Sequence, residues 1–370
     1  MILLNDFKRQ WEATRSDALA AFESVGASGW YILGQELRDF EAALARYWGL
    51  AHCAGVASGL DALELSLKVL GCVPGDRVLT TPVSAFATTL AIVKAGGVPV
   101  FVDVDRFGLI DLDQCRALLS QRDDIRFLIP VHLYGHALDL TKLAALHDDF
   151  GVAIIEDCAQ SIGASFGGRP TGSAGQIAAT SFYPTKNLGA LGDGGAILTN
   201  DSAGRDAVMH LRDYGQTAKY RHDVIGYNSR LDELQAALMS RVYLPLVDGW
   251  LARRRQIAAS YCRLLQNDRI AVAGAPEGSA STWHLFPVYV DAERKQAFMA
   301  HLKRNGVLSA EHYPIPIHDQ RALGGAPFEV VGPLERAREQ CRTEVSLPIH
   351  PYLTDGELER VVDACNGWTS

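Results

Sequence analysis

The chain has 370 residues, 48% of them hydrophobic and 21% charged, which is typical of a folded globular protein and argues against a disordered or fibrous one. A chain of this length predicts one large domain and one smaller domain. The net charge of −8 and the pI of about 5.8 argue against a general affinity for nucleic acid or anionic membranes, so any phosphate must be bound locally.

The sequence also bears on where the protein works. Its first residues, MILLNDFKRQW, contain only a short apolar run before acidic and basic residues, which is unlike a secretory signal. No stretch approaches the roughly 20 apolar residues that a membrane span needs. The seven cysteines are widely spaced and include no C-x-x-C pair, which argues against a disulfide framework or a zinc site. We therefore expect a cytoplasmic protein with reduced thiols.

Short apolar runs alternate with helical patterns between about residues 50 and 200, which is typical of βαβ units and a largely parallel sheet. The segment 139–151 is predicted to be a helix that Asp139 or Thr141 caps and Gly151 ends. Runs rich in β-branched and aromatic residues predict strands at residues 77–82, 98–105, 127–135, 152–159 and 178–184.

The pattern changes after residue 240, where residues 242–265 predict a long amphipathic helix that begins around a proline. We place the domain boundary at the start of this helix, which gives a large domain (1–244) and a small domain (245–370). The small domain is predicted to be α+β. Its predicted parts are a strand at 282–290, a helix at 291–305 and a proline-rich loop at 312–318.

Two polar residues stand at or just after the end of a predicted strand. Asp157 closes the apolar run VAIIED, and a carboxylate in that position must be paired or functional. Gln160 follows three residues later, so both side chains can point into the crevice at the carboxyl end of the sheet, where open α/β proteins bind ligands. The structural alternative for Asp157 is to cap the following turn.

A lysine and a glycine-dense turn follow the next predicted strand. The segment SFYPTKNLGALGDGGA (181–196) contains Ser181, Lys186 and glycines that let the backbone pass close to a bulky ligand. Lysines are usually exposed, however, and glycines also simply make turns. The glycine spacing is not a dinucleotide fingerprint, and the chain has no G-x-x-x-x-G-K-[ST], so a nicotinamide or ATP enzyme is disfavoured.

The segment 55–71 begins with small residues and continues as a predicted helix. Free amides at such a helix start can cradle a phosphate, although an ordinary glycine and serine cap has the same sequence. One cofactor uses a phosphate cradle, an acid opposite a ring nitrogen and a lysine able to form a Schiff base, and that cofactor is pyridoxal 5′-phosphate (PLP). The acid keeps the pyridinium nitrogen protonated, and the lysine holds the aldehyde and moves the proton.

Several longer motifs follow one another along the chain: SGLDALELSLKVLG, PVHLYG, IIEDCAQSIGA, SFYPTKNLGALGDGGAILTND and GYNSRLDELQAA. In these motifs and their order the sequence resembles the nucleotide-sugar aminotransferases of the DegT/StrS type, and the resemblance runs from residue 28 to residue 357. It implies an α/β protein of the fold type I aminotransferase class. In that class a large domain built on a mostly parallel sheet carries a smaller C-terminal α+β domain.

The resemblance implies roles for three polar residues. Lys186 is expected to form the Schiff base with PLP and to act as the catalytic residue. Asp157 is expected to pair with the pyridine nitrogen, and Gln160 to contact the ring hydroxyl of the cofactor.

The resemblance also implies how the rest of the cofactor is held. Ser181 and the amides of Gly59 and Leu60 are expected to bind the phosphate. Family members usually have threonine where this chain has Leu60, so one hydroxyl donor to the phosphate is missing. Phe86 matches the aromatic residue that stacks on the cofactor ring, although an apolar phenylalanine is more often part of a core.

The active sites of the family lie between two subunits, so the resemblance implies a homodimer in which Asn228 reaches the phosphate of the neighbour's cofactor. The sequence is most similar to enzymes that act on dTDP-linked 3-keto-6-deoxyhexoses. By that likeness Tyr183, His312 and Tyr313 line the sugar pocket, and Lys219 faces the diphosphate bound by the neighbouring subunit.

We therefore expect a PLP-dependent transfer of the amino group of glutamate to a dTDP-3-keto-6-deoxyhexose, through pyridoxamine 5′-phosphate, giving a dTDP-3-amino-3,6-dideoxyhexose. A 4-keto nucleotide sugar and an inosose are the alternative substrates. A dehydratase is a less favoured alternative, because dehydratases that resemble this family carry histidine at the position of Lys186. A PLP-binding regulator is also disfavoured, because it would need a DNA-binding segment and this acidic chain has no basic patch. His132 and His136 have a metal-like spacing, but Gly135 breaks the helix that such ligation needs, so we interpret both as structural and expect no metal.

Overall fold

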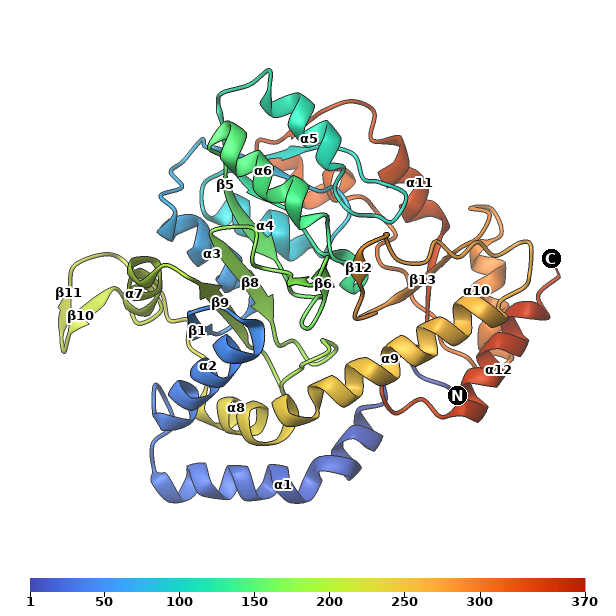
Figure 1. Ribbon diagram of the computed structural model, residues 1–370, viewed down its shortest axis with the longest axis horizontal. Coiled ribbons are helices and arrows are strands. Elements are labelled where there is room, and N and C mark those ends of the chain that lie inside the picture. The colour runs from blue at the N-terminus through green and yellow to red at the C-terminus, as the bar shows by residue number, and fades with distance from the viewer. Residues whose placement is uncertain (370) are drawn as a thin grey trace.

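A mixed sheet forms the centre of the structure, a computed structural model that describes residues 1–369 (Figure 1). Its strands lie in the order β1-β9-β8-β5-β4-β2-β3-β14. β9 is antiparallel to both of its neighbours, and every pair from β8 to β14 is parallel. The bounds are β1 His52–Val56, β2 Arg77–Thr80, β3 Val98–Phe101, β4 Ile125–Ile129, β5 Ala153–Asp157, β8 Ile177–Ser181, β9 Gly195–Thr199 and β14 Glu329–Val330.

Each predicted strand overlaps one of these strands. β4 and β8 begin before the predicted segments 127–135 and 178–184, and all five observed strands end earlier than predicted. β3 ends at Phe101 and β4 at Ile129, whereas the apolar runs continue for several residues. Val131 and Leu133 are buried after β4 because the loops at the carboxyl edge of the sheet are themselves packed. Burial therefore extends the apolar pattern beyond the hydrogen-bonded ladder.

Helices cover both faces of the sheet, as a parallel sheet requires. Neighbouring residues of β5 divide between the two faces, since Ile154 packs in the core that α5 and α6 complete and Ile155 in the core that α3 and α4 complete. The bounds of these and the adjoining helices are α2 Gln35–Trp48, α3 Gly59–Val69, α4 Phe86–Lys94, α5 Leu112–Leu119, α6 Leu140–Phe150, α7 Ser202–Leu211 and α8 Glu233–Leu238.

The predicted helix over 139–151 is confirmed together with its ends. Asp139 accepts hydrogen bonds from the amides of Thr141 and Lys142, and Gly151 closes the helix with a φ of 68°. The predicted helix within 55–71 is confirmed as α3, where Ser58 accepts from the amide of Asp61. These three helix ends depend on interactions between residues that are near neighbours in sequence, which is why the sequence predicts them well.

The C-terminal part of the chain has its own small sheet, which Figure 1 shows beside α9, and its own core of buried side chains. A short π-helical stretch, Met239–Tyr243, leads into the predicted long helix α9 (Leu244–Leu264), which has a proline in its first turn. β13 pairs antiparallel with β15. The remaining elements here are α10 Lys295–Arg304, α11 Glu335–Thr343, α12 Asp355–Asn366, β13 Phe286–Tyr289, β15 Glu344–Leu347, η3 Ile317–Asp319 and η4 Arg321–Gly325.

We propose that the chain divides near residue 244, because the buried side chains that follow α9 form a core separate from the cores of the large sheet. The N-terminal residues pack into this second core, since the amide of Ile2 donates to the carbonyl of Gly306 and Ile2 bridges Val307. The first helix, α1 (Phe7–Ser28), then crosses to the edge of the large sheet and contacts α8 (Figure 1).

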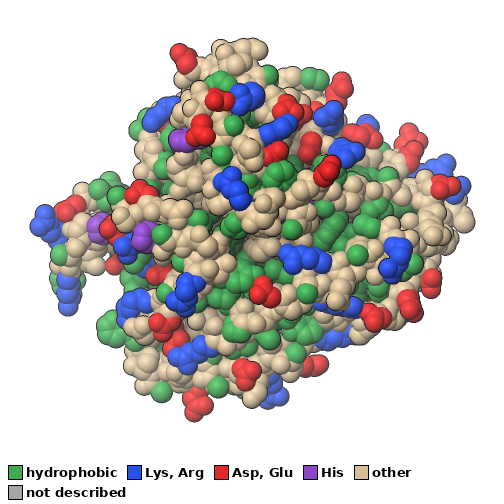
Figure 2. Space-filling view, in the orientation of Figure 1, with side chains coloured by type: hydrophobic (Ala, Val, Ile, Leu, Met, Phe, Trp, Pro, Cys, Tyr) green, Lys and Arg blue, Asp and Glu red, His purple; other side chains and the backbone are tan. Residues whose placement is uncertain are grey.

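A two-stranded arm stands away from the body of the molecule. It consists of β10 (Gln216–Ala218) and β11 (Arg221–His222), and Figure 2 shows basic side chains at its end. The short elements that remain are β6 Ser165–Phe166, β7 Arg169–Pro170, β12 Ser279–Ala280 and the 3-10 turn η1 Leu133–Gly135. Among the described residues, no helix combines the length and the hydropathy of a membrane span.

Candidate active site

A cavity of about 490 Å³ opens at the carboxyl edge of the central sheet. It lies between the start of α3, the ends of β5 and β8, and two segments of the C-terminal part. This is the position at which open α/β sheets bind ligands. The structure places most of the predicted site residues on its wall: Gly59, Leu60, Asp157, Ser181, Tyr183, Lys186, His312 and Tyr313.

Lys186 follows β8 and carries its amine into this cavity. Its Nζ forms no hydrogen bond or ion pair with any of the described residues. Burial lowers the pKa of the Lys186 amine to about 8, and the charge of Asp157 partly opposes this shift. The environment therefore gives Lys186 a larger fraction of neutral amine than an ordinary lysine has, and the neutral amine is the nucleophilic form.

Asp157 is the last residue of β5 and lies buried at the base of the cavity. Its Oδ2 accepts a hydrogen bond from Thr88 Oγ1 at 2.9 Å, and its Oδ1 accepts from the amide of Ala159 at 3.1 Å. Burial raises the pKa of the Asp157 carboxyl, while these two hydrogen bonds and the charge of Lys186 act in the opposite direction. A buried carboxylate that is fixed in this way can hold a positively charged ring nitrogen.

The start of α3 packs tightly against β8 and β9. The amides of Gly59 and Leu60 belong to the first turn of the helix and have no partner within it. A Cβ on Gly59 would lie 2.6 Å from the Cβ of Ser181, and one on Gly195 would lie 2.4 Å from the carbonyl carbon of Ser58. Only glycine lets these backbones approach so closely, which leaves the helix amides and the Ser181 hydroxyl side by side.

Gln160 and Phe86 lie next to the cavity, but they are not among the residues that line it. Gln160 accepts a hydrogen bond from the amide of Tyr134 at 2.7 Å and donates one to Tyr313 Oη at 3.3 Å. Phe86 is the first residue of α4 and packs partly buried against the core of the large sheet.

Lys219 and Asn228 are exposed and do not line the cavity of their own chain. Lys219 lies in the turn of the β10–β11 arm, where its Nζ is 5.3 Å from the centre of the Tyr220 ring. Asn228 follows the arm and forms a bridge with Asp213. Both positions are consistent with roles toward a second subunit.

Two residues of the site were not predicted from the sequence. Thr88, on α4, positions Asp157, and His284, from the C-terminal part, lines the cavity with its ring buried. Burial is the main cause that lowers the pKa of His284, and the charge of Lys186 adds to it. Neither residue lies in a motif that points to chemistry, so only the fold brings them to the site.

The two histidines with metal-like spacing are buried. His132 Nε2 lies 2.8 Å from Glu156, and His136 Nδ1 lies 2.9 Å from Ser281 Oγ. His132, Glu156 and Cys158 are close enough to share an ion. The atoms that would bind one are engaged instead, because His132 Nδ1 accepts the amide of Leu138 and Glu156 accepts three backbone amides.

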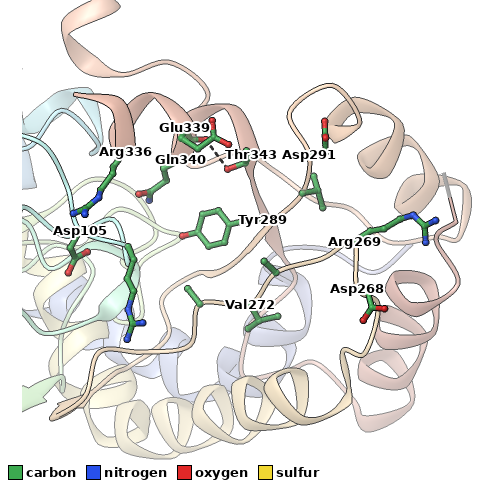
Figure 3. A pocket seen from close by; sticks show the side chains of 14 residues that line it. Asp105, Asp268, Arg269, Val272, Tyr289, Asp291, Arg336, Glu339, Gln340 and Thr343 are labelled. Atoms are coloured by element: carbon green, nitrogen blue, oxygen red, sulfur yellow. Dashed lines mark hydrogen bonds between the residues drawn. The ribbon is translucent and has the colours of Figure 1, made fainter. Parts of the chain in front are cut away.

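A second large cavity, of about 590 Å³, lies apart from Lys186 (Figure 3). Tyr289 and Gln340 form part of its wall, with charged side chains around them. Gln340 Nε2 donates to Tyr134 Oη at 2.9 Å, and Tyr134 Oη donates to the carbonyl of His312 at 2.6 Å. The second cavity thus borders the residues that support His312.

Comparison with known proteins identifies the group to which this site belongs. The model of the DegT/DnrJ/EryC1/StrS aminotransferase family matches residues 12–366. The chain belongs to this family. Relatives and structural neighbours that are named for an activity include sugar transaminases, and this protein is a PLP-dependent α/β enzyme that transfers an amino group to a nucleotide-linked sugar.

The relatives of this aminotransferase align over nearly its whole length. A dTDP-3-amino-3,4,6-trideoxy-α-D-glucose transaminase of Streptomyces venezuelae is 41% identical, covering 98% of this chain and 95% of the relative. A dTDP-3-amino-3,6-dideoxy-α-D-galactopyranose transaminase of Aneurinibacillus thermoaerophilus is also 41% identical, covering 94% and 93%. The crystal structure of S. venezuelae DesV with a ketimine intermediate superimposes with a TM-score of 0.94 at 40% identity, covering 99% and 98%. Names of other relatives refer to UDP-linked sugars or to regulation.

PLP is the cofactor of this family, and the residues of the cavity fit it. The cavity combines the amine of Lys186, which has no partner among residues 1–369, with a buried carboxylate and with helix amides beside a hydroxyl. The backbone at these amides is packed too closely for any side chain larger than glycine. These groups match the aldehyde, the ring nitrogen and the phosphate of PLP.

Proposed function

We propose that the enzyme aminates the 3-keto group of a dTDP-linked 6-deoxyhexose, with glutamate as the amino donor. The observation that carries this proposal is the placement of Tyr183, His312 and Tyr313 on the wall of the cavity that holds Lys186. The names of the two dTDP-sugar relatives support the same nucleotide and the same position of amination. The product is a dTDP-3-amino-3,6-dideoxyhexose.

Bound PLP supplies an electron sink and carries the amino group from one substrate to the other. Glutamate binds first and leaves as 2-oxoglutarate, and the keto sugar then receives the amine. Lys186 would hold the cofactor between turnovers, and its free amine would accept and return the proton that transamination moves. The pKa of about 8 suits this role, because the amine both accepts and returns a proton near neutral pH.

The other residues of the cavity bind and orient the cofactor. We propose that Asp157, held by Thr88, keeps the ring nitrogen protonated. The amides of Gly59 and Leu60 and the hydroxyl of Ser181 bind the phosphate at the start of α3, where the helix dipole adds to the attraction.

We assign Gln160 to the hydroxyl of the cofactor ring and Phe86 to the face of that ring. Gln160 reaches the ring hydroxyl once its hydrogen bond to Tyr313 opens. That bond is long, at 3.3 Å, so little is lost when it breaks. Phe86 stacks on the ring after a rotation of its side chain, since its neighbours Ala85 and Ala87 already line the cavity.

We further propose that the active enzyme is a homodimer. The arm and the residues that follow it expose apolar as well as basic side chains, since Tyr220 in the arm is 83% exposed and Ile225 after it is 96% exposed. If a partner subunit covers these residues, Lys219 and Asn228 of the first subunit would lie at the cavity of the partner. The diphosphate of the sugar and the phosphate of the cofactor need cations and hydrogen-bond donors there.

The proposal is tested by assaying the purified holoenzyme with glutamate and matched dTDP-3-keto and dTDP-4-keto 6-deoxyhexoses, with mass spectrometry of the aminated nucleotide. We expect kcat/KM to be at least about tenfold higher for the 3-keto sugar, because the cavity must place one carbonyl against the amine. A UDP-linked sugar serves as the nucleotide control. A higher kcat/KM for the 4-keto or the UDP-linked sugar contradicts the proposal.

A further inference from the structure

His312 is fixed between the cavity and a buried strand. The segment before it bridges β15, because the amide of Ser346 donates to the carbonyl of Ala310 at 2.8 Å and the amide of Ala310 donates back at 3.3 Å. The imidazole lines the cavity, and its Nδ1 lies 2.9 Å from Ser346 Oγ. Nε2 forms no hydrogen bond with any of the described residues, so it is the nitrogen left for a ligand.

A buried carboxylate continues this contact into the protein. Ser346 Oγ lies 2.5 Å from Glu344 Oε1, and Glu344 Oε2 accepts the backbone amide of His312 at 2.6 Å. Glu344 and Ser346 are two residues apart on β15, so their side chains share one face of the strand. Both are fully buried, and the hydrogen-bonded chain Glu344–Ser346–His312 therefore runs from the cavity into the protein.

The surroundings give Glu344 and His312, the two ends of this hydrogen-bonded series, different proton affinities. Burial, together with the charge of Lys186, lowers the pKa of His312 to about 4, so the ring stays neutral near pH 7. Burial raises the pKa of Glu344 to about 7, although hydrogen bonds from Ser346 and the His312 amide oppose the shift. A ring that stays neutral must release the proton on one nitrogen when it takes one on the other, and Glu344 can store the released proton.

Other titratable groups around Glu344 come from every element packed against it. Lys295 on α10 is the nearest cation, but its Nζ is already paired with Glu311 at 2.6 Å. Tyr289 lies opposite Glu344 in the β13–β15 pair and is seen in Figure 3. The titratable groups that interact with the carboxyl are Lys295, Glu311, His312, Tyr134, Tyr289, Tyr313 and Cys341.

The hydrogen bonds allow two arrangements. With Glu344 ionised, Ser346 donates to it and His312 Nδ1–H donates to Ser346, which leaves Nε2 as an acceptor in the cavity. With Glu344 protonated, its hydroxyl donates to Ser346, Ser346 donates to His312 Nδ1, and the ring proton resides on Nε2. The heavy atoms keep their places in both arrangements.

We propose that Glu344, Ser346 and His312 form a reversible proton relay that decides which imidazole nitrogen carries the proton at the substrate cavity. When Nε2 takes a proton from the cavity, the Nδ1 proton passes to Ser346 Oγ and the Ser346 proton passes to Glu344, so one proton enters and none is lost. Glu344 and Ser346 are thus positioning residues. The relay presents Nε2–H to the keto oxygen of the sugar, which can only accept.

This inference rests on the proposed function for its role in turnover, but the relay itself can be observed without any sugar. We propose to label the holoenzyme with ¹⁵N-histidine and to follow the ring nitrogens of His312 by NMR as a function of pH, with His312→Gln to assign them. We expect the proton on Nε2 below about pH 7 and on Nδ1 above it, because Glu344 loses its proton there.

Two variants and a control separate the relay from a general structural effect. Glu344→Gln keeps an acceptor for the His312 amide and a donor for Ser346, so Nε2–H should persist at every pH. Ser346→Ala breaks the path, so the tautomer should no longer follow Glu344. Glu311→Gln removes a nearby carboxylate outside the path, and the pH-dependent switch should remain.

Kinetics give a second measurement. Ser346→Ala should lower kcat/KM for the keto sugar on the order of 100-fold, whereas Glu344→Gln should retain activity and lose the decline that the parent shows as pH rises through 7. A His312 tautomer that stays constant with pH in the parent, or that still switches in Glu344→Gln, overturns the relay. Failure of the 3-keto assay alone contradicts the substrate and leaves the NMR result standing.

Discussion

At the scale of single residues, the environment turns ordinary side chains into reactive ones. Lys186 is one of many lysines and arginines in the chain, and nothing in its side chain sets it apart. Burial lowers the pKa of its amine, and β8 delivers it to a cavity whose base is Asp157. The sequence predicted both residues because each follows an apolar run, which is a local signal. It could not predict Thr88, whose contact with Asp157 spans 69 residues.

Replacing Lys186 tests the central assignment. We expect Lys186→Ala to lower turnover by about 10⁴-fold or more, because no other side chain supplies the amine that holds the cofactor and moves the proton. Borohydride reduction should add the mass of the cofactor to the parent and leave the variant unchanged. Lys186→Arg is the matched control, since it keeps a positive charge without a nucleophilic amine. A variant that aminates the sugar at the parental rate contradicts the assignment.

The lowered pKa of Lys186 predicts how fast PLP is captured at different pH values. The rate constant for capture by cofactor-free protein should rise with pH and level off above about 8, because the neutral amine is the reacting form. An ordinary lysine, with a pKa of 10.5, would not level off until much higher pH. Absorbance after mixing with PLP measures this rate.

A charge substitution checks the cause of that shift. Asp157 raises the pKa of Lys186, so Asp157→Asn should move the midpoint of the rate profile below that of the parent. A midpoint that moves upward, or a parental midpoint near that of an exposed lysine, argues against the buried environment described for the amine.

At the scale of secondary-structure elements, helix ends differ in how far along the sequence the capping residue lies from the helix that it caps. Ser58 and Asp139 cap α3 and α6 from within their own motifs, and both helices were predicted. Gly34, the residue before α2, has no side chain that could cap this helix. Glu233, the first residue of α8, accepts the amides of Gly34, Glu36 and Leu37 instead. The sequence does not show this cap because it joins distant segments.

Removing the charge of Glu233 should therefore destabilise the protein. We expect Glu233→Gln to lower the free energy of unfolding by about 1–3 kcal/mol, because its amide group turns a donor toward backbone donors in a buried place. Asp39→Asn, an exposed change on α2, is the control and should alter stability by less than about 0.5 kcal/mol. Urea denaturation of both variants measures the difference, and equal stabilities would mean that Glu233 does not cap α2.

At the scale of the whole molecule, the cavity of one chain is lined by most of the residues that the family resemblance assigns to the site, but not by all of them. Lys219 and Asn228 lie on or near the exposed arm. Their place is explained if two copies of the chain exchange arms. The homodimer remains a prediction that a mixing experiment can decide.

We expect two inactive variants to restore each other when their subunits are mixed. Lys186→Ala lacks the amine, and Lys219→Ala lacks the cation for the neighbour's diphosphate. In an equal mixture, half of the dimers contain one complete site, so about a quarter of the parental activity should return at low sugar concentration. Activity no greater than the average of the two unmixed variants would show that each chain builds its site alone.

The sequence by itself determined the alternation of strands and helices, the local caps and the motif residues Asp157, Ser181 and Lys186. These depend on hydrophobic periodicity and on contacts between near neighbours, which the order of residues states directly. The tertiary structure decided that β9 runs antiparallel to its neighbours β1 and β8, that Glu233 caps α2 and that Glu344 reaches His312 through a serine. Those features join residues distant in sequence and depend on burial, so they exist only once the chain has packed.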